Sequence, residues 1–397
     1  MERISQYEDL ITPCFILNTE ELVRSIHGYQ NALNNCFEKS IIGYSVKTNS
    51  IPYCLNLAGK EGAYAEVVSY DEYELAKLCG FEQKHIIYNG PMKSKETFLE
   101  AVMNGAIVNI ETKRELEWLQ ELPQNKVFRV GIRLNINISY ISPEDADVDN
   151  DNSRFGFSDD TMEFADAISV IRTLSNVVLE GLHIHRTAHS RSLRFYKKSI
   201  NYTCEIIKKY GLQLNYIDVG GGYFGIFPNK PTYQQYSDAF YEVLSQHGLE
   251  RLCVIVEPGN AVVASCYDFL SEVIDVKHIE SERWFITTDG SRNDIDPFFK
   301  KMSYLENELY QTETSVVKEQ IISGCTCLEY DRLFTLTDKP LLSVGDRIHY
   351  KNVGAYTMCL TPMFIRYIPN IYVRGIDGYS LIREKWTAEE YIQKSKI

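Results

Sequence analysis

Eight short apolar runs, rich in β-branched residues and separated by segments of helical periodicity, occupy the first two thirds of the 397-residue chain. This alternation is typical of parallel strands joined by crossover helices. A closed (β/α)8 barrel needs eight strands, whereas an open doubly wound sheet usually stops at about six. We therefore expect an α/β fold with a (β/α)8 barrel over residues 26–264. The predicted strands are residues 40–47, 62–68, 85–88, 106–110, 127–134, 177–185, 215–219 and 252–257.

The sequence changes character after residue 265, where strand-like runs follow one another with few long helices. Examples are CYDFLSEVIDVKHI, RWFITTD and MFIRYIPNIYV. This pattern predicts an all-β, sandwich-like second domain over residues 265–397. The opening segment CFILN, before a helix that Asn18 or Thr19 could cap, lies outside the barrel repeat. We assign residues 1–25 to the second domain, to which CFILN would add a strand.

The charge balance excludes several kinds of partner. The chain has 54 acidic and 41 basic side chains, a net charge of -13 and no basic run, whereas nucleic acid or an anionic membrane needs a clustered basic face. No signal-peptide pattern is present, and no apolar stretch approaches the roughly 18 residues that span a bilayer. We expect a cytoplasmic enzyme. Its ten scattered cysteines are interpreted as reduced thiols, since Cys325 and Cys327 are too close together for a zinc knuckle.

Polar residues close several predicted strands, and this end of the strands carries the active site in (β/α) barrels. Lys47 ends the first run, YSVKTN. A lysine at this place is either a structural residue with an extended stem or a desolvated amine suited to Schiff-base formation. Glu257 ends the eighth run, where a buried carboxylate is costly unless it is paired.

The sixth and seventh runs end in GLHIHR and DVGGGY. Strand alternation puts His183 and His185 on the same side of the sixth run. Two histidines at this spacing could bind a metal ion, but no acidic companion motif supports this, so we expect no metal and favour a stacked or core role. The glycines at 220–222 either form a tight turn or let the backbone approach a phosphate.

The order of these motifs resembles a known family, the fold-type III pyridoxal-phosphate decarboxylases, which include diaminopimelate and ornithine decarboxylases. The motifs that carry the resemblance are YSVKTN at Lys47, HxH around His185, GGGY at 220–223, EPG at 257–259, GCTCLEYD and GAYT at 354–357. Weaker matches are TPCFIL near the start, AEVVSYDE at 65–72, NGPMKS at 89–94, IRLN at 132–135 and SRFGF at 153–157. The resemblance therefore covers nearly the whole chain.

The resemblance implies pyridoxal phosphate as the cofactor and an alanine racemase-like pair of domains. Lys47 would hold the cofactor as a Schiff base, His185 would stack on its ring, and Glu257 would bond the pyridinium nitrogen. An arginine has the role of Glu257 in alanine racemases, so Glu257 favours decarboxylation. Further cofactor contacts are implied for Glu66, Arg133, Gly259 and, at the phosphate, Gly220, Gly221, Gly222 and Tyr356.

Cys327 falls on the family cysteine that returns a proton to the α-carbon after CO2 has left. In the family this cysteine reaches across from the partner subunit, which implies a homodimer with shared active sites and a β domain that contributes to the interface. Asp331 belongs to the same matching segment and is a candidate substrate contact. The alternative for Cys327 is a buried thiol.

The departures from the family concern the substrate. Diaminopimelate decarboxylases hold the distal carboxylate of the substrate with two arginines, where this chain has Asn260 and Asp296. Loss of both cations disfavours diaminopimelate. The acid that normally follows the family cysteine is Leu328, although Glu329 and Asp296 could replace its negative charge.

The loop after the sixth run also differs, because HRTAHS stands where the family has the phosphate-binding segment HIGS. Thr187 or Ser190 would then replace the usual serine. Arg186, Arg191 and Arg194 either bind an acidic extension of the substrate or lie solvated on a helix face. Together with DGSRNDIDPFF, this loop is similar to a divergent branch that decarboxylates biosynthetic conjugates, such as citryl-diaminopropionate in siderophore assembly or a carrier-linked glutamate in antibiotic assembly.

The sequence thus predicts a pyridoxal-phosphate-dependent carboxy-lyase that acts on an amino acid or an amino-acid conjugate. Two alternatives stay open. One is an amino-acid racemase or epimerase, and the other is a catalytically silent homologue that binds the cofactor and acts through partners.

Overall fold

The structure is a computed structural model that describes residues 3–396 except residues 5, 147–152, 187, 189 and 281. The chain divides into two compact units, residues 23–262 and residues 1–22 with 263–397. Each unit is built around its own sheet. None of the helices in the described part of the chain is both long and apolar enough to cross a bilayer.

The first unit is a closed barrel of eight parallel strands. Going round the barrel, the strands follow the order of the sequence, and β11 pairs with β3 to close the ring. The strands are β3 (Ser40–Ser45), β4 (Tyr64–Ser69), β5 (Ile86–Met92), β6 (Ile107–Ile110), β7 (Phe128–Asn135), β9 (Val177–His183), β10 (Tyr216–Asp218) and β11 (Cys253–Val256). All eight predicted strands are confirmed. A ninth, β8 (Phe157–Ser158), pairs with β7 outside the ring.

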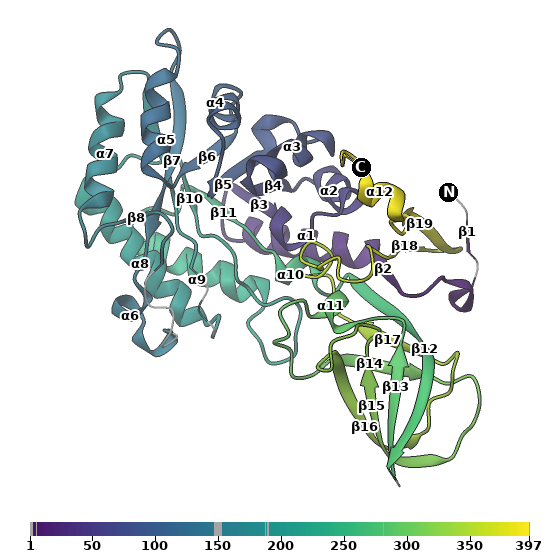
Figure 1. Cartoon of the computed structure of the whole chain (residues 1–397). Helices are drawn as coiled ribbons and strands as arrows, with labels where there is room; N and C mark the ends of the chain where they lie inside the picture. Colours follow the sequence, from purple (N-terminus) through teal and green to yellow (C-terminus); the bar gives the residue numbers. More distant parts are fainter. Residues whose placement is uncertain are drawn as a thin grey trace. The chain divides into compact units, whose positions relative to one another are not determined.

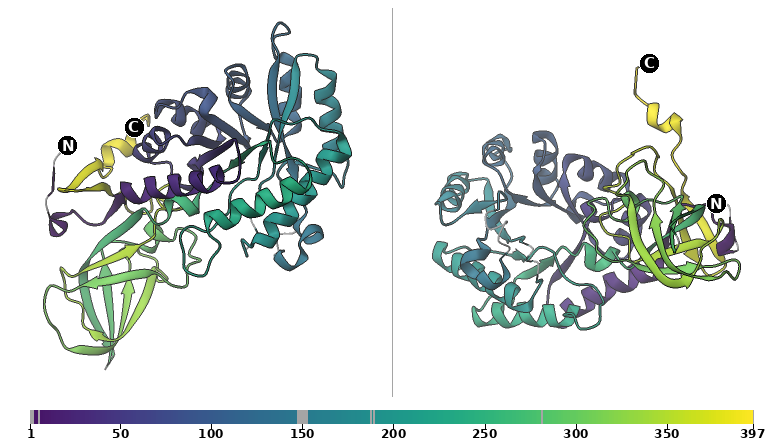
Figure 2. Two further views of the ribbon diagram at one scale, coloured as in Figure 1. Left: turned by 180° about the vertical axis from the view of Figure 1, so that it is seen from behind. Right: turned by 60° about the horizontal axis from the view of Figure 1, so that its bottom comes forward.

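A helix follows each barrel strand, and the helices lie around the outside of the strands (Figures 1 and 2). The barrel is preceded by α1 (Thr19–Asn34), whose first turn is capped by Asn18, since Asn18 Oδ1 accepts from the Glu21 backbone amide at 3.2 Å. The helices after the strands are α2 (Pro52–Lys60), α3 (Tyr70–Leu78), α4 (Lys95–Met103), α5 (Lys113–Trp118), α7 (Glu163–Thr173), α8 (Leu193–Tyr210), α9 (Tyr233–Gln246) and the short α10 (Asn260–Val263), with α6 (Ile138–Ile141) in the loop after β7.

The barrel interior contains a large side chain that faces glycines. Tyr216, at the start of β10, is buried, and its ring lies over Gly131 of β7 and Gly181 of β9. A Cβ on Gly181 would lie 1.8 Å from Tyr216 Cζ, and one on Gly131 would lie 2.1 Å from the Tyr216 hydroxyl. Glycine at these two positions therefore makes room for the phenol ring across the interior.

The second unit is mostly β-structure, as the sequence predicted (Figure 1). The opening strand β2 (Cys14–Asn18) lies between β18 and β12, antiparallel to β12, so the segment CFILN adds a strand to this unit as expected. All its strands join in one hydrogen-bonded network through the 14-residue β12. The elements after β12 (Tyr267–Glu280) are β13 (Arg283–Thr288), α11 (Arg292–Ile295), β14 (Leu305–Leu309), β15 (Val316–Ser323), β16 (Arg332–Pro340), β17 (Arg347–Lys351), β18 (Asn370–Gly375), β19 (Gly378–Arg383) and α12 (Ala388–Ile392), while β1 (Arg3–Ile4) pairs with β19.

Candidate active site

Lys47 lies at the carboxyl end of β3, in a short turn over residues Val46–Thr48. Its Nζ is 2.5 Å from Oε2 of Glu66, which is in the neighbouring strand β4. The same carboxylate oxygen accepts a hydrogen bond from Ser45 Oγ at 2.7 Å. Glu66 is buried, whereas the Lys47 side chain is 29% exposed. The barrel thus places the Lys47 amine at its mouth and pairs it with the buried carboxylate of Glu66.

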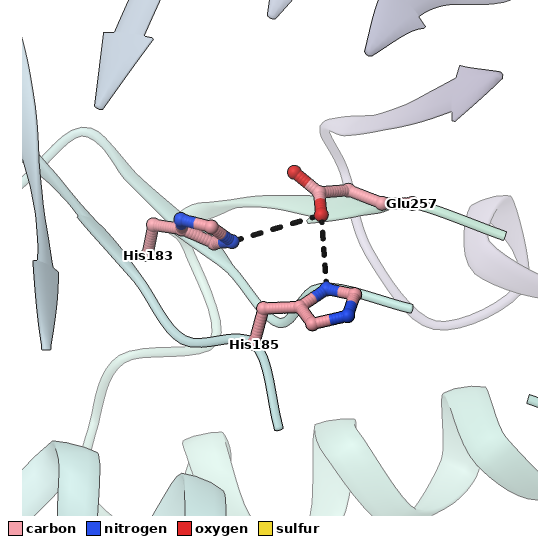
Figure 3. Close-up of side chains that lie close together, drawn as sticks. All are labelled: His183, His185 and Glu257. Carbon is pink, nitrogen blue, oxygen red and sulfur yellow. Dashed lines mark hydrogen bonds and ion pairs between the residues drawn. The ribbon is translucent and has the colours of Figure 1, made fainter. Parts of the chain in front are cut away.

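Glu257 follows β11 and brings a second buried carboxylate to the barrel mouth (Figure 3). Its Oε2 is 3.3 Å from His185 Nδ1 and 3.6 Å from His183 Nε2. Burial raises the pKa of Glu257, but the adjacent His183 and His185 outweigh this effect and hold the pKa well below its usual range. Burial in turn lowers the pKa of His183 below its usual value in spite of Glu257. The two shifts together favour an ionised Glu257 beside a neutral His183.

The strand that carries the two histidines is shorter than predicted. β9 ends at His183, so His185 lies in the following loop, yet both rings face Glu257 (Figure 3). One ligand atom from each of these three residues lies within 4.8 Å of the others, a spacing that a metal ion could bridge. The sequence offered no acidic companion for the histidine pair, and the fold supplies one from a different strand.

Asn89, which sequence reasoning did not single out, connects the two carboxylates. From β5 its Nδ2 lies 2.5 Å from Glu257 Oε1 and 3.3 Å from Glu66 Oε1. Asp218, at the end of β10, is buried and accepts a hydrogen bond from the Gly220 backbone amide at 3.0 Å. Burial and the charge of Glu257 raise the pKa of Asp218 well above its usual range.

The glycine turn at 220–222 is required by close packing. Gly220 and Gly222 have φ angles of +69° and +92°, in the left-handed region that favours glycine. A Cβ on Gly221 would lie 2.3 Å from the backbone oxygen of Glu257. Gly259 has a similar role, since a Cβ there would lie 2.2 Å from Oγ1 of Thr48, the residue after Lys47. Gly221 thus lets the turn at 220–222 contact the backbone of Glu257, and Gly259 lets the turn after β11 contact Thr48, next to Lys47.

Arg133, at the end of β7, holds the loop after β9. Its Nη2 donates to the backbone oxygen of His185 at 2.9 Å, and its Nη1 is 2.8 Å from Oε1 of the buried Glu111. The guanidinium also lies over the ring of Phe155, 4.8 Å from the centroid. Arg133 therefore positions the chain at His185, from which Arg186 continues the loop.

The remainder of this loop is tied to a buried carboxylate. Asp145 accepts from the Ser192 hydroxyl at 3.1 Å and from Ser190, and it pairs with Arg194 at 3.2 Å. Burial opposes these contacts, but together they lower the pKa of Asp145 to about 2. The hydroxyl of Ser190 is thus engaged by Asp145, and Thr187, the other candidate for the phosphate-binding role, lies outside the described residues.

The loop from 324 to 331 in the second unit carries the remaining candidates and lines a cavity of about 380 Å³. Cys327 and Glu329 are exposed, whereas Asp331 is buried. The carboxylate of Asp331 accepts from the hydroxyls of Ser291 and Thr326 at 3.0 and 2.6 Å and from the backbone amides of Arg292 and Thr326 at 2.9 and 3.1 Å. Asp331 therefore shapes the loop that presents Cys327.

Asp296 is also satisfied within its own unit. Its Oδ2 accepts from Arg292 Nε at 2.9 Å and from the Lys301 amide at 3.0 Å, and its Oδ1 accepts from the Lys300 amide at 3.1 Å. These donors offset the negative charge of Asp296. Tyr356, the candidate phosphate contact in this unit, has a positive φ of +55° and is 40% exposed.

Residues 21–264 match the family described as "Pyridoxal-dependent decarboxylase, pyridoxal binding domain". The chain belongs to this family. The diaminopimelate decarboxylase of Methanocaldococcus jannaschii is 24% identical over 415 residues, which cover 100% of this chain and 94% of that protein. An L-glutamyl-(BtrI acyl-carrier protein) decarboxylase of Niallia circulans is 26% identical over 374 residues, which cover 88% of this chain and 86% of that protein.

Solved structures agree on the fold. The crystal structure of the M. jannaschii diaminopimelate decarboxylase has a TM-score of 0.86 at 24% identity and covers 98% of this chain and 93% of its own. The arginine decarboxylase of Paramecium bursaria Chlorella virus has a TM-score of 0.74 at 18% identity, with 89% and 94% covered. The predicted family, the barrel with a separate β unit, the decarboxylase class and the pyridoxal phosphate cofactor are confirmed.

The described residues suit this cofactor. A Schiff-base amine, a buried carboxylate that stays charged and a glycine turn that a Cβ would obstruct meet at one end of one barrel. Of the candidates in the barrel, Lys47, Glu66, His185 and Glu257 are joined by direct contacts or through Asn89. Cys327, Glu329, Asp331, Asp296 and Tyr356 belong to the other unit.

Proposed function

We propose that this protein removes the α-carboxylate of an amino acid or amino-acid conjugate, with Lys47 as the Schiff-base lysine. The observation that carries the proposal is the buried, ionised Glu257, which shares the Asn89 amide with Glu66, the partner of Lys47. The cofactor supplies an electron sink at the α-carbon. An anion that faces its ring nitrogen favours the protonated ring and hence decarboxylation.

Each of the other residues in the barrel has a role in this proposal. His185 would lie against the cofactor ring, held through its backbone oxygen by Arg133. Gly220, Gly221 and Gly222 would let the backbone of this turn approach the phosphate, which Tyr356 would also contact. Gly259 would keep Thr48 and Lys47 close to the turn after β11. Glu66 would orient Lys47 and accept its proton.

Cys327 would return a proton to the α-carbon, from the partner subunit of a homodimer. This part of the proposal is supported by the exposure of Cys327 on a loop that Asp331 holds in shape. A thiol that acts in the active site of a partner subunit must be exposed on the surface of its own subunit.

The substrate proposal rests on the distal group. Asp296 and Asn260 stand where diaminopimelate decarboxylases carry arginines, and Asp296 is already neutralised by Arg292 and backbone amides. A site with no arginine at these two positions disfavours a second amino-acid centre. We propose a substrate whose distal end differs from that of diaminopimelate, such as a conjugate in siderophore or antibiotic assembly. The N. circulans relative, which is named for a carrier-linked glutamyl substrate, supports this choice. Arg186 and Glu329 are proposed as contacts of the distal group.

The test is turnover in deuterated water. Protein reconstituted with pyridoxal phosphate is incubated with basic, acidic and conjugated amino acids and with diaminopimelate, and the products are analysed by mass spectrometry. A product that lacks CO2 and carries one deuterium supports the proposal and identifies the substrate class. Deuterium exchange without loss of CO2 would move the protein to the racemases, and normal cofactor binding without any turnover would favour a silent homologue.

A further inference from the structure

One amide at the barrel mouth serves two carboxylates. Asn89 is buried, and its Nδ2 lies within hydrogen-bond distance of both Glu66 Oε1 and Glu257 Oε1. An amide nitrogen carries two N–H donors, so Asn89 can supply one to each acid. The carboxylate that faces Lys47 and the carboxylate that faces the histidine pair are therefore held by a single side chain.

The orientation of this amide is fixed from behind. Asn89 Oδ1 accepts from Asn109 Nδ2 at 2.8 Å, and Asn109 Oδ1 accepts from the Tyr216 hydroxyl at 2.8 Å. Turning the Asn89 amide over would set its nitrogen against the Asn109 donor and its oxygen against two carboxylates. Because buried polar groups are costly when unsatisfied, this chain directs the Asn89 donors toward the site.

The barrel makes room for this chain of hydrogen bonds. A Cβ on Gly131 would lie 2.1 Å from both Asn109 Oδ1 and the Tyr216 hydroxyl, and Gly181 clears the Tyr216 ring in the next strand. The two glycines thus leave space for Asn109 and Tyr216 that any larger residue would fill. They indicate that the fold is arranged around Tyr216, Asn109 and Asn89 together.

The electrostatics require such a donor. Glu66 and Glu257 are both buried and sit on either side of the Asn89 nitrogen. Two carboxylates in a dry site repel each other unless donors lie between them. Asn89 also keeps a donor on Glu66 when the Lys47 amine is engaged elsewhere.

We propose that Asn89 is a positioning residue, whose amide nitrogen fixes Glu66 toward Lys47 and Glu257 toward the histidine pair. This inference rests on the proposed function, since it assumes that Lys47 and Glu257 hold the cofactor. It assigns a role to the first residue of the NGPMKS segment, which is by itself only a weak match to the family.

The test compares Asn89→Ala and Asn89→Asp with the control Asn176→Ala. Asn89→Ala removes both donors, and Asn89→Asp keeps the volume but replaces the donors by an acceptor. Asn176 is also a buried asparagine of the barrel unit. It lies just before β9, at the opposite end of the strands, and donates to the backbone oxygens of Leu122 and Pro123. The readouts are the dissociation constant of pyridoxal phosphate, the melting temperature of cofactor-free protein, and kcat and KM.

We expect the dissociation constant to rise at least tenfold in Asn89→Ala and further in Asn89→Asp, and to stay within twofold in Asn176→Ala. The melting temperatures of the cofactor-free alanine variants should fall by similar amounts, and kcat should fall at Asn89 while KM stays within threefold. If one Asn89 variant fails to fold, the other is compared with the control.

Wild-type cofactor affinity in a folded Asn89 variant would overturn the inference and leave the decarboxylase proposal intact. An equal loss of affinity in Asn176→Ala would show a purely structural effect and would also overturn it. Failure of the wild-type protein to bind the cofactor or to release CO2 would instead refute the proposed function.

Discussion

The barrel mouth and the loop from 324 to 331 both carry predicted catalytic residues, but they hold them differently. At the mouth, Lys47, Glu66, Asn89 and Glu257 bind one another across four strands of one unit. In the loop, the buried acid Asp331 binds the loop itself, and the predicted proton donor Cys327 is exposed. The difference shows that contacts within one unit fix the side chains at the mouth, whereas in the loop such contacts fix the backbone and leave the Cys327 side chain exposed.

The largest effect is expected at the mouth. Lys47→Ala should abolish covalent cofactor attachment and lower kcat by about 10⁴-fold or more, because no other amine contacts Glu66 in the described residues. The measurement is the visible absorbance of the bound cofactor, with borohydride reduction followed by mass spectrometry. Lys84→Ala, at an exposed lysine paired with Glu82, is the control and should change nothing. A persistent covalent adduct in Lys47→Ala would refute the assignment.

The second effect tests the charge at the mouth. Glu257→Gln keeps the shape and removes the anion, and kcat should fall by about 10²- to 10³-fold. Because the pKa of Glu257 lies well below its usual range, Glu257 stays ionised as pH falls, and the wild-type kcat/KM profile should show no acidic limb above pH 5 from this group. Wild-type kcat in Glu257→Gln, with the cofactor bound, would contradict the role of the charge.

A third experiment tests whether the loop acts across subunits. Cys327→Ala should lower kcat by about 10- to 100-fold, since one proton donor is lost. Mixing Lys47→Ala with Cys327→Ala subunits should then restore about a quarter of wild-type activity, because each hybrid dimer keeps one intact shared site. Cys325→Ser, two residues away in the same cavity, serves as control and should retain kcat within threefold. No recovery in the mixture would mean that each subunit completes its own site.

The smallest effect concerns the loop after β9. Asp145→Asn should lower the unfolding free energy by about 1 to 3 kcal/mol at pH 7, because Arg194 and two serines lose a charged acceptor. The folded pKa of Asp145 is about 2, below its unfolded value, so its contribution is present above about pH 4 and is lost as pH falls toward 2. Urea melts at pH 7 and pH 3 should show the difference between variant and wild type shrinking; a constant difference would contradict this.

The barrel could be predicted because its strands are continuous β-branched runs, buried on both faces. The β unit was predicted less completely. β14 reads LENEL and β16 reads RLFTLTDKP, and both carry charges and exposed positions that hide the strand pattern. Their place depends on pairing with β17 and β15, which the sequence does not reveal.

The site was predictable where a residue type and a strand end coincide, as at Lys47 and Glu257. Asn89 and Asp145 were missed because asparagine and aspartate are common and their roles depend on partners from other segments. The sequence also could not show that the carboxylates of Asp296 and Asp331 are already hydrogen-bonded within their own unit, because each accepts from two backbone amides.

Tyr216, Gly131 and Gly181 also limit how this barrel can evolve or be redesigned. A side chain added at Gly181 meets the phenol ring first, and one added at Gly131 meets the Tyr216 hydroxyl and Asn109 Oδ1 at the same distance. Shrinking the ring alone would leave a void and remove the hydroxyl that orients the amide above it. Substitutions at these three positions are therefore epistatic. Each single change destabilises the barrel, and a repacked interior must change all three residues together.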